Sequence, residues 1–163
     1  MQKTISGSAQ IFAQDDIDTD LIIPAKYLTT SDSAELAEHV LEAIDGGKLK
    51  SVENPIVVAG NNFGCGSSRE HAVWALAGAG VVAVIAESFA RIFFRNSVNF
   101  GLPTFVIPEA SQKFAAGDAI EIDSDPPRRT KIKNLTQKTE FEFQPLPAFL
   151  NQIVEAGGLL NQI

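Results

Sequence analysis

The chain has 163 residues, of which 45% are hydrophobic, and its 20 acidic and 13 basic side chains give a formal net charge of −7. A chain of this length can bury an adequate core without a staple, and its single cysteine, Cys65, excludes both an internal disulfide and a thiolate cage for zinc or an iron–sulfur cluster. The acidic balance argues against a nucleic acid or an anionic membrane as partner, because the one dense basic stretch is short and consists of Arg128, Arg129, Lys131 and Lys133.

The amino-terminal residues 1–9 lack the basic region and the apolar run of a signal peptide. No stretch approaches the roughly 20 apolar residues that a membrane-spanning helix needs. The nearest thing to a linker, residues 123–129 with Pro126 and Pro127, is too short to separate domains. We therefore expect a cytoplasmic protein whose residues 1–163 form one domain.

The first third of the chain contains four closely spaced aspartates, Asp15, Asp16, Asp18 and Asp20. They do not form a calcium loop, because a count from Asp16 places no glycine at position six and no glutamate at position twelve. Turn and cap chemistry explains most of them, although Asp18 and Asp20 share one face if the segment is extended. Residues 22–30 are typical of a strand end or loop, and the apolar spacing in residues 34–44 predicts a helix.

The middle of the chain alternates buried strands with helices. Short β-branched runs bounded by Gly or Pro predict strands at residues 56–59, 81–85 and 104–107. Ser67 and Ser68 are expected to cap a helix that ends at Gly80, and a second helix is expected to begin at Ser88 and to place Phe89, Ile92 and Phe93 on one face. This order predicts a parallel βαβ core.

The last third alternates apolar and polar residues at 119–123, 131–135 and 139–143, as antiparallel strands with one solvated face do. A final helix is expected to begin at Pro147 and to stop at Gly157, with four buried residues: Phe149, Leu150, Ile153 and Val154. The predicted fold class is α/β, with a parallel βαβ core and an antiparallel β extension.

The residues most suggestive of chemistry lie at 60–71, between a buried strand and a helix. Glycines let this backbone approach a ligand, and two hydroxyls with the Arg69 guanidinium suit a carboxylate or phosphate at a helix N-terminus. Ser67 stands where a phosphate-binding loop needs Lys, and Arg69 stands where a dinucleotide site needs its third Gly. An anion other than a nucleotide is favoured; the alternative is an ordinary capped helix start.

Cys65 and His71 could suggest a Cys–His nucleophile, but no third residue is placed to orient them. A small buried thiol is the better interpretation of Cys65, and His71 is interpreted as a satisfied structural or supporting group. His39, on the predicted helix of residues 34–44, is expected to face solvent.

Three separated motifs resemble one known family. Gly-Cys-Gly-Ser-Ser-Arg-Glu-His-Ala at residues 64–72, Asp-Thr-Asp-Leu-Ile-Ile-Pro at 18–24 and Glu-Ser-Phe-Ala-Arg-Ile-Phe at 87–93 are similar to small subunits of the aconitase superfamily, above all the isopropylmalate dehydratase (isopropylmalate isomerase) family. Residues 157–160, Gly-Gly-Leu-Leu, resemble it too. The likeness implies a swivelling β/β/α domain that closes over a large subunit carrying a 4Fe-4S cluster on three cysteines.

The resemblance also implies roles for single residues. Ser67 matches the family's catalytic base, a serine alkoxide that removes the proton beside a carboxylate, so the site must stabilise that alkoxide. Arg69 resembles the residue that binds a substrate carboxylate, with Ser68 as a supporting donor. Asp20 matches an active-site aspartate that orients a partner group.

Substrate choice is expected to depend on the loop Lys26–Thr30, with Tyr27, Leu28, Thr29 and Thr30 as substrate-binding candidates. Homoaconitase-like relatives tend to carry Arg where Thr29 stands, and threonine offers no bidentate carboxylate clamp. This favours a substrate with an apolar third arm, for which Leu28 is a contact candidate.

The resemblance thus implies a hydro-lyase small subunit that isomerises 2-isopropylmalate to 3-isopropylmalate through isopropylmaleate, in leucine biosynthesis. The expected partner is a large subunit in a heterodimer or heterotetramer, whose cluster acts as Lewis acid, while this chain binds no metal and takes a small dicarboxylic acid. Alternatives are a homoaconitase or a 2,3-dimethylmalate or citraconate dehydratase small subunit, and a non-catalytic anion-binding module.

Overall fold

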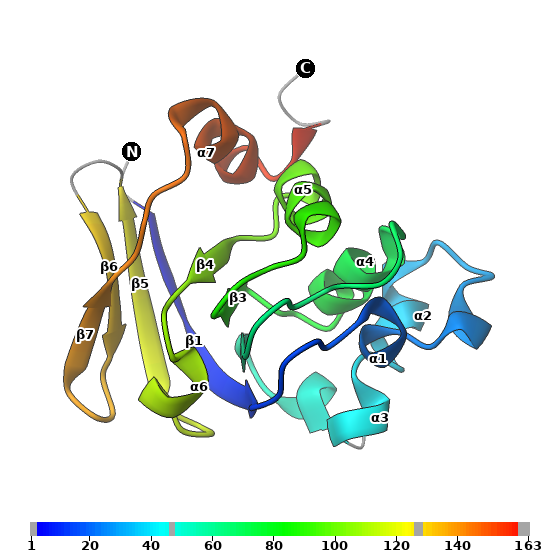
Figure 1. The fold of residues 1–163 in the computed structure, drawn as a ribbon, viewed down its shortest axis with the longest axis horizontal. Helices are drawn as coiled ribbons and strands as arrows, with labels where there is room; N and C mark the ends of the chain where they lie inside the picture. Colours follow the sequence, from blue (N-terminus) through cyan, green and yellow to red (C-terminus); the bar gives the residue numbers. More distant parts are fainter. Residues whose placement is uncertain (1–2, 46–47, 126–128, 160–163) are drawn as a thin grey trace.

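A computed structural model describes residues 3–45, 48–125 and 129–159, and it contains a seven-stranded mixed sheet (Figure 1). The strand order is β4-β3-β2-β1-β5-β6-β7. The parallel half comprises β1 (Lys3–Phe12), β2 (Pro55–Ala59), β3 (Ala83–Ala86) and β4 (Thr104–Val106). The antiparallel half adds β5 (Ala119–Asp125), β6 (Arg129–Asn134) and β7 (Thr139–Glu142). The predicted α/β class, with its parallel core and antiparallel extension, is confirmed.

The central strand β1 is absent from the sequence-based expectations. It pairs in parallel with β2 and antiparallel with β5, so it joins the two halves of the sheet. Its sequence alternates polar residues such as Ser6 and Ser8 with Ile5, Gly7 and Ala9, so it lacks the continuous apolar run that marks β2 and β3. The period-two alternation was the available signal.

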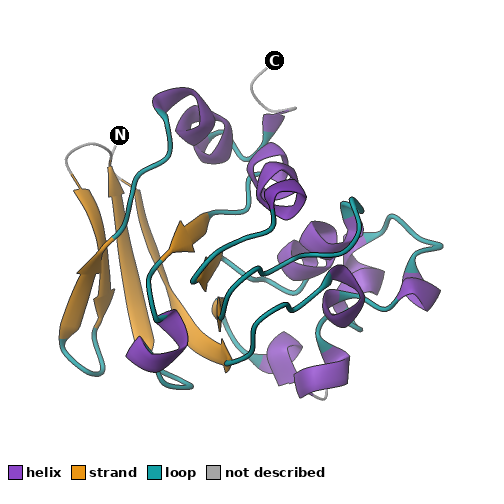
Figure 2. Ribbon diagram, viewed as in Figure 1, coloured by secondary structure: helices purple, strands orange, loops and turns teal. Residues whose placement is uncertain are grey.

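Most of the helices lie at the end of the molecule opposite the antiparallel strands, whereas α6 (Ala110–Lys113) lies beside those strands (Figure 2). In chain order they are α1 (Thr19–Ile22), the 3-10 turn η1 (Ala25–Tyr27), α2 (Ser33–Ala37), α3 (Glu42–Asp45), the 3-10 turn η2 (Lys48–Ser51), α4 (His71–Gly78), α5 (Arg91–Phe100), α6 (Ala110–Lys113) and α7 (Ala148–Glu155). No helix among the described residues is long and apolar enough to cross a bilayer.

In the first third of the chain, the structure differs from two of the sequence-based expectations. The loop or strand end expected at residues 22–30 contains the end of α1 and the turn η1. The single helix expected at residues 34–44 is broken into α2 and α3, because Leu41 has φ +53° and donates its N–H to the carbonyl of Ile22 at 2.8 Å. A tertiary hydrogen bond therefore overrides the helical pattern of the sequence.

The later helices begin or pack differently from the expectation. Helix α4 starts at His71 with Glu70 at its N-cap, so Ser67 and Ser68 lie in the preceding loop and do not cap it. Helix α5 starts at Arg91 rather than Ser88, and Ile92 is exposed. In α7, which packs against α5, Phe149 is also exposed and Val154 is the buried residue.

Both faces of β2 and β3 are buried. On β2, Val57 and Ala59 belong to one core cluster and Ile56 and Val58 to the other, as strand alternation requires. The first cluster contains the apolar side chains of α1, α2 and α4, so it fixes these short helices against the carboxyl ends of β1 and β2.

Candidate active site

The loops that follow β1, β2 and β3 meet at the carboxyl edge of the parallel strands. Three backbone hydrogen bonds, each 2.8 Å long, join the first two loops: Asp16 N to Asn61 O, Gly64 N to Ile17 O, and Thr19 N to Cys65 O. The third loop is attached through Phe63, whose N–H donates to the carbonyl of Ser88 at 3.1 Å. These bonds bring residues 18–20 beside residues 65–69.

Gly64 and Gly66 let the second loop make this approach. Their φ angles are +85° and +109°, in the left-handed region that other residues seldom adopt. A Cβ on Gly64 would also overlap the side chain of Phe93, which packs edge-on against Phe63. These glycines therefore permit a close approach of the backbone, as expected, but the atoms that they approach belong to Phe93 and Thr19 and not to a ligand.

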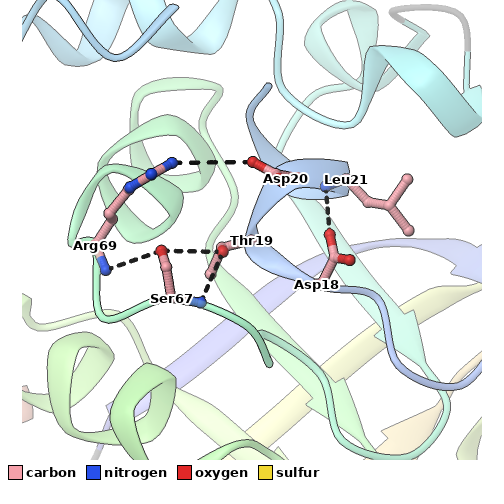
Figure 3. A network of polar contacts seen from close by, with 6 residues as sticks. All are labelled: Asp18, Thr19, Asp20, Leu21, Ser67 and Arg69. Atoms are coloured by element: carbon pink, nitrogen blue, oxygen red, sulfur yellow. Dashed lines mark hydrogen bonds and ion pairs between the residues drawn. The ribbon is translucent and has the colours of Figure 1, made fainter. Parts of the chain in front are cut away.

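Ser67 lies between two hydrogen-bonding groups (Figure 3). Its Oγ is 3.2 Å from Oγ1 of Thr19, and it accepts the backbone N–H of Arg69 at 3.4 Å. The backbone N–H of Ser67 itself donates to Thr19 Oγ1 at 3.2 Å. When Thr19 accepts this N–H, its own O–H remains free to donate to Ser67, so Ser67 Oγ can receive two donors.

Arg69 and Asp20 form an open, solvent-exposed ion pair, with 3.9 Å between Nη1 and Oδ1. Their side chains are 45% and 69% exposed, so the pair contributes little to stability. Among the residues that the structure describes, no hydrogen bond is given from this guanidinium, so its donors are available. It can therefore bind a carboxylate beside Ser67 while Asp20 limits its orientations.

Of the other three aspartates, only Asp18 shows the expected cap chemistry, while Asp15 and Asp16 bond instead to the second loop, 46 residues away. Asp18 caps α1 by accepting the N–H of Leu21 at 2.9 Å, Asp15 accepts from Asn61 N at 2.7 Å, and Asp16 accepts from Asn62 Nδ2 at 2.9 Å. The shared face of Asp18 and Asp20 required an extended segment, and this condition is not met, because Asp20 lies in the helical turn α1.

Cys65 is a poor nucleophile candidate. Burial raises the pKa of its thiol, and the nearby carboxylates of Asp16 and Asp18 raise this pKa further, so the thiol stays protonated at neutral pH. The expectation of a small buried thiol is met only in part, because Cys65 is partly exposed.

Two histidine expectations need correction. Nδ1 of His71 is buried without a hydrogen-bond partner among the described residues, so this side chain is not satisfied; its ring packs on Trp74. His39 does not simply face solvent, since its ring stacks on Tyr27 and its Nδ1 lies 2.9 Å from Glu42 Oε2.

The other predicted site residues make contacts that do not involve the side chain of Ser67. The carbonyl of Ser68 accepts from Asn96 Nδ2 at 3.2 Å, which joins the Ser67 loop to α5, and its side chain is exposed. Leu28 packs partly against the core, the Tyr27 hydroxyl bonds Glu42, and Thr30 Oγ1 accepts from Asp32 N at 3.0 Å. Thr29 is exposed. Among the described residues, no hydrogen bond or ion pair given by the structure joins this loop to Ser67.

Thr19 is a site residue that the sequence pattern did not single out. It is only 6% exposed and touches Ser67 through its side chain. Its position inside the motif Asp18-Thr19-Asp20 was the one indication in the sequence. Its contact with Ser67, 48 positions away, depends on the tertiary structure. Within the described ranges, no group of three or more His, Cys, Asp and Glu side chains is placed to bind a metal ion.

Comparisons with known proteins agree with this geometry. Residues 10–110 match the family model of the aconitase C-terminal domain. The 3-isopropylmalate dehydratase small subunit 1 of Methanopyrus kandleri is 49% identical over 100% of this chain and 94% of its own length, and the small subunit of Caldicellulosiruptor saccharolyticus is 53% identical over 90% and 84%. The crystal structure of 3-isopropylmalate dehydratase from Methanocaldococcus jannaschii superimposes with a TM-score of 0.88 at 42% identity, covering 98% of this chain and 92% of that one.

Proposed function

This chain belongs to the aconitase C-terminal domain family, as one of its 3-isopropylmalate dehydratase small subunits, and from that membership we propose which of its residues perform the reaction. It is the small subunit of a hydro-lyase of leucine biosynthesis, and a small subunit implies a large-subunit partner. Nothing in the comparisons favours a homoaconitase, a dimethylmalate or citraconate dehydratase, or a non-catalytic module. The substrate is 2-isopropylmalate, converted through isopropylmaleate to 3-isopropylmalate.

The proposal depends on one observation, the contact of Ser67 Oγ with Thr19 Oγ1 and with the N–H of Arg69. Removal of the proton beside a carboxylate needs a strong base, and a neutral serine hydroxyl is too weak. Two donors aimed at one oxygen stabilise its negative charge, as in an oxyanion hole. Ser67 as alkoxide takes the proton, becomes a neutral hydroxyl, and returns the proton to the neighbouring carbon when water is added back.

Arg69 binds a substrate carboxylate through two parallel N–H bonds, which places the acidic C–H next to Ser67. Asp20, 3.9 Å from the guanidinium, orients it and is a positioning residue. Ser68 is a supporting donor, since its exposed hydroxyl adjoins both groups in sequence.

The loop Lys26–Thr30 selects the third arm of the substrate. Thr29 is exposed and uncharged, so it cannot neutralise a distal carboxylate and instead tolerates an isopropyl group. Tyr27, Leu28 and Thr30 support the loop through the contacts described above.

The 4Fe-4S cluster used by aconitase-family dehydratases does not fit the residues of this chain. Cys65 is its only cysteine, with a raised thiol pKa, and the described residues contain no metal-binding group. We therefore assign the cluster to the large subunit, and residues 1–163 to the single swivelling domain that closes over it.

Reconstitution with a cluster-bearing large subunit tests the assignment. We expect wild-type complex to isomerise 2-isopropylmalate, and Ser67→Ala to lower kcat by at least about 10³-fold, because the proton acceptor is lost. Ser111→Ala, on the distant helix α6, is the matched control and should retain full turnover. Substantial turnover by Ser67→Ala would refute Ser67 as the base.

A further inference from the structure

Tyr27, His39 and Glu42 form a polar cluster outside the Ser67 site. The rings of Tyr27 and His39 are stacked, with centroids 3.7 Å apart and planes 1° from parallel. The Tyr27 hydroxyl donates to Glu42 Oε1 at 2.9 Å, and His39 Nδ1 lies 2.9 Å from Glu42 Oε2. Because a carboxylate only accepts, Nδ1 must carry a proton. Both carboxylate oxygens are therefore occupied, and we call these three side chains the Tyr27 anchor.

The charge on Glu42 strengthens the Tyr27 anchor. The hydrogen bond from His39 lowers the pKa of Glu42, and the bond from Tyr27 lowers it further, while burial opposes both. Glu42 is thus ionised at neutral pH, and hydrogen bonds to a charged acceptor are the stronger kind. The side chains of His39 and Glu42 are only 33% and 31% exposed, so water competes for these bonds only in part.

The Tyr27 anchor lies at the base of the loop Lys26–Thr30. Tyr27 ends η1, where its N–H donates to Pro24 O at 3.0 Å and the N–H of Leu28 donates to Ala25 O at 3.1 Å. Beyond the anchor, Thr29 is exposed and lines a cavity of about 300 Å³ whose other walls include Thr30 and His39. The anchor thus fixes one end of the loop and leaves Thr29 accessible.

The backbone joins the Tyr27 anchor to the Ser67 site. Leu41 adopts φ +53°, which is sterically unfavourable for leucine, and its N–H donates to Ile22 O at 2.8 Å. Ile22 is the last residue of α1, the helix that carries Thr19 and Asp20, and Glu42 follows Leu41 directly. Such strain in the backbone often marks a functional position.

We propose that Tyr27, His39 and Glu42 are positioning residues that set the conformation of the substrate-selecting loop. The ring and hydroxyl of Tyr27 already contact His39 and Glu42, so Tyr27 influences specificity by holding the loop in place. The exposed side chain of Thr29 is then the one available to the substrate. This inference rests on the proposed function, in which the loop selects the third arm of the substrate.

Steady-state kinetics of the reconstituted complex tests the proposal with isopropylmaleate and its smaller analogue citraconate. Glu42→Ala should raise KM for isopropylmaleate about tenfold and leave kcat within about twofold, because binding rather than proton transfer is affected. Its preference for isopropylmaleate over citraconate should fall. Glu42→Gln keeps an acceptor for Tyr27 and should recover part of the loss, and Tyr27→Phe, which keeps the ring, should be intermediate. Glu53→Ala, at an exposed carboxylate outside the residues that line this cavity, should match wild type.

Hydrogen exchange on the full isolated chain gives a readout independent of activity. Glu42→Ala and Tyr27→Phe should speed exchange of the Tyr27 and Leu28 amides, and Glu53→Ala should not. If wild-type complex fails to hydrate isopropylmaleate, the proposed function fails, while the exchange data still decide the anchor. Unchanged exchange in both variants, or an unchanged KM and preference in Glu42→Ala despite a lower Tm, would overturn the proposal.

Discussion

The hydroxyl oxygen of Thr19 lies 3.2 Å from that of Ser67 and also accepts the backbone N–H of Ser67. Two side chains from segments far apart in sequence thereby share a pair of contacts at the carboxyl edge of the sheet. Because Thr19 Oγ1 accepts this N–H, its O–H remains free to donate to Ser67 Oγ, the oxygen that we propose becomes an alkoxide. We therefore propose that Thr19 supports the proton transfer by Ser67.

Thr19→Val removes this donor with little change of volume. We expect kcat to fall by about 10²-fold, as when a single oxyanion donor is lost, with KM little changed. Steady-state kinetics of the reconstituted complex measures both values. Thr19→Ser, which keeps the hydroxyl, should retain most of the turnover; equal losses in the two variants would show that the methyl packing, and not the hydroxyl, matters.

Arg69→Lys tests whether the carboxylate is bound by two parallel bonds. Lysine preserves the charge but offers a single point donor, so we expect KM to rise about 10- to 100-fold with a smaller change in kcat. Asp20→Asn removes the 3.9 Å ion pair and should produce a milder rise, because the exposed pair only orients the guanidinium. A KM near the wild-type value in Arg69→Lys would contradict the bidentate grip.

Gly64→Ala tests the close approach of the loop to α5. The substitution places a left-handed alanine, costing about 1–2 kcal/mol, and a Cβ that overlaps Phe93, costing about 1–3 kcal/mol more. Gly80 has almost the same φ, +86°, and a Cβ there would meet no atom within 4 Å, so Gly80→Ala isolates the backbone cost. Urea unfolding of both variants should show the larger loss for Gly64→Ala; equal losses would mean that Phe93 moves away freely.

A comparison of the predicted strands and site residues with the structure shows which features a sequence can predict. Strands β2 and β3 were predictable because both of their faces are buried and their apolar runs are continuous, whereas β1 exposes polar residues such as Ser6 and lacks such a run. Ser67 and Arg69 lie in one motif, but the Thr19 contact depends on how two loops pair. The break at Leu41 likewise follows from a bond to Ile22, which no local pattern encodes.

Asp118 makes the stability of the antiparallel half depend on pH. Burial, at 5% exposure, opposes its ionisation, but donors from Ala115 N, Asn134 and Gln137 outweigh burial and lower the pKa of Asp118. A lowered pKa in the folded state stabilises the protein above the unfolded value of 3.8, and this stabilisation is lost as pH falls through the folded value.

Asp118→Asn should therefore reduce the free energy of unfolding by about 1–3 kcal/mol at pH 7, because buried donors lose their charged acceptor. The difference from wild type should shrink as the pH falls below the unfolded value of 3.8 and through the lower pKa of Asp118 in the folded protein. Chemical denaturation across this range measures it, with Glu53→Gln as the control at an exposed carboxylate. A difference independent of pH would rule out the charge as its origin.

Thr29→Arg tests whether the loop selects the third arm of the substrate. An arginine here can bind a distal carboxylate, so the kcat/KM ratio of homoaconitate to isopropylmaleate should rise about tenfold. Glu35 and Glu38 line the same cavity and would partly neutralise the new guanidinium, so Thr29→Arg combined with Glu38→Ala should shift the ratio further. Thr29→Met adds volume without charge and should leave homoaconitate excluded. If Met and Arg alter the ratio equally, Thr29 acts through space alone, and the charge-based account of substrate choice is wrong.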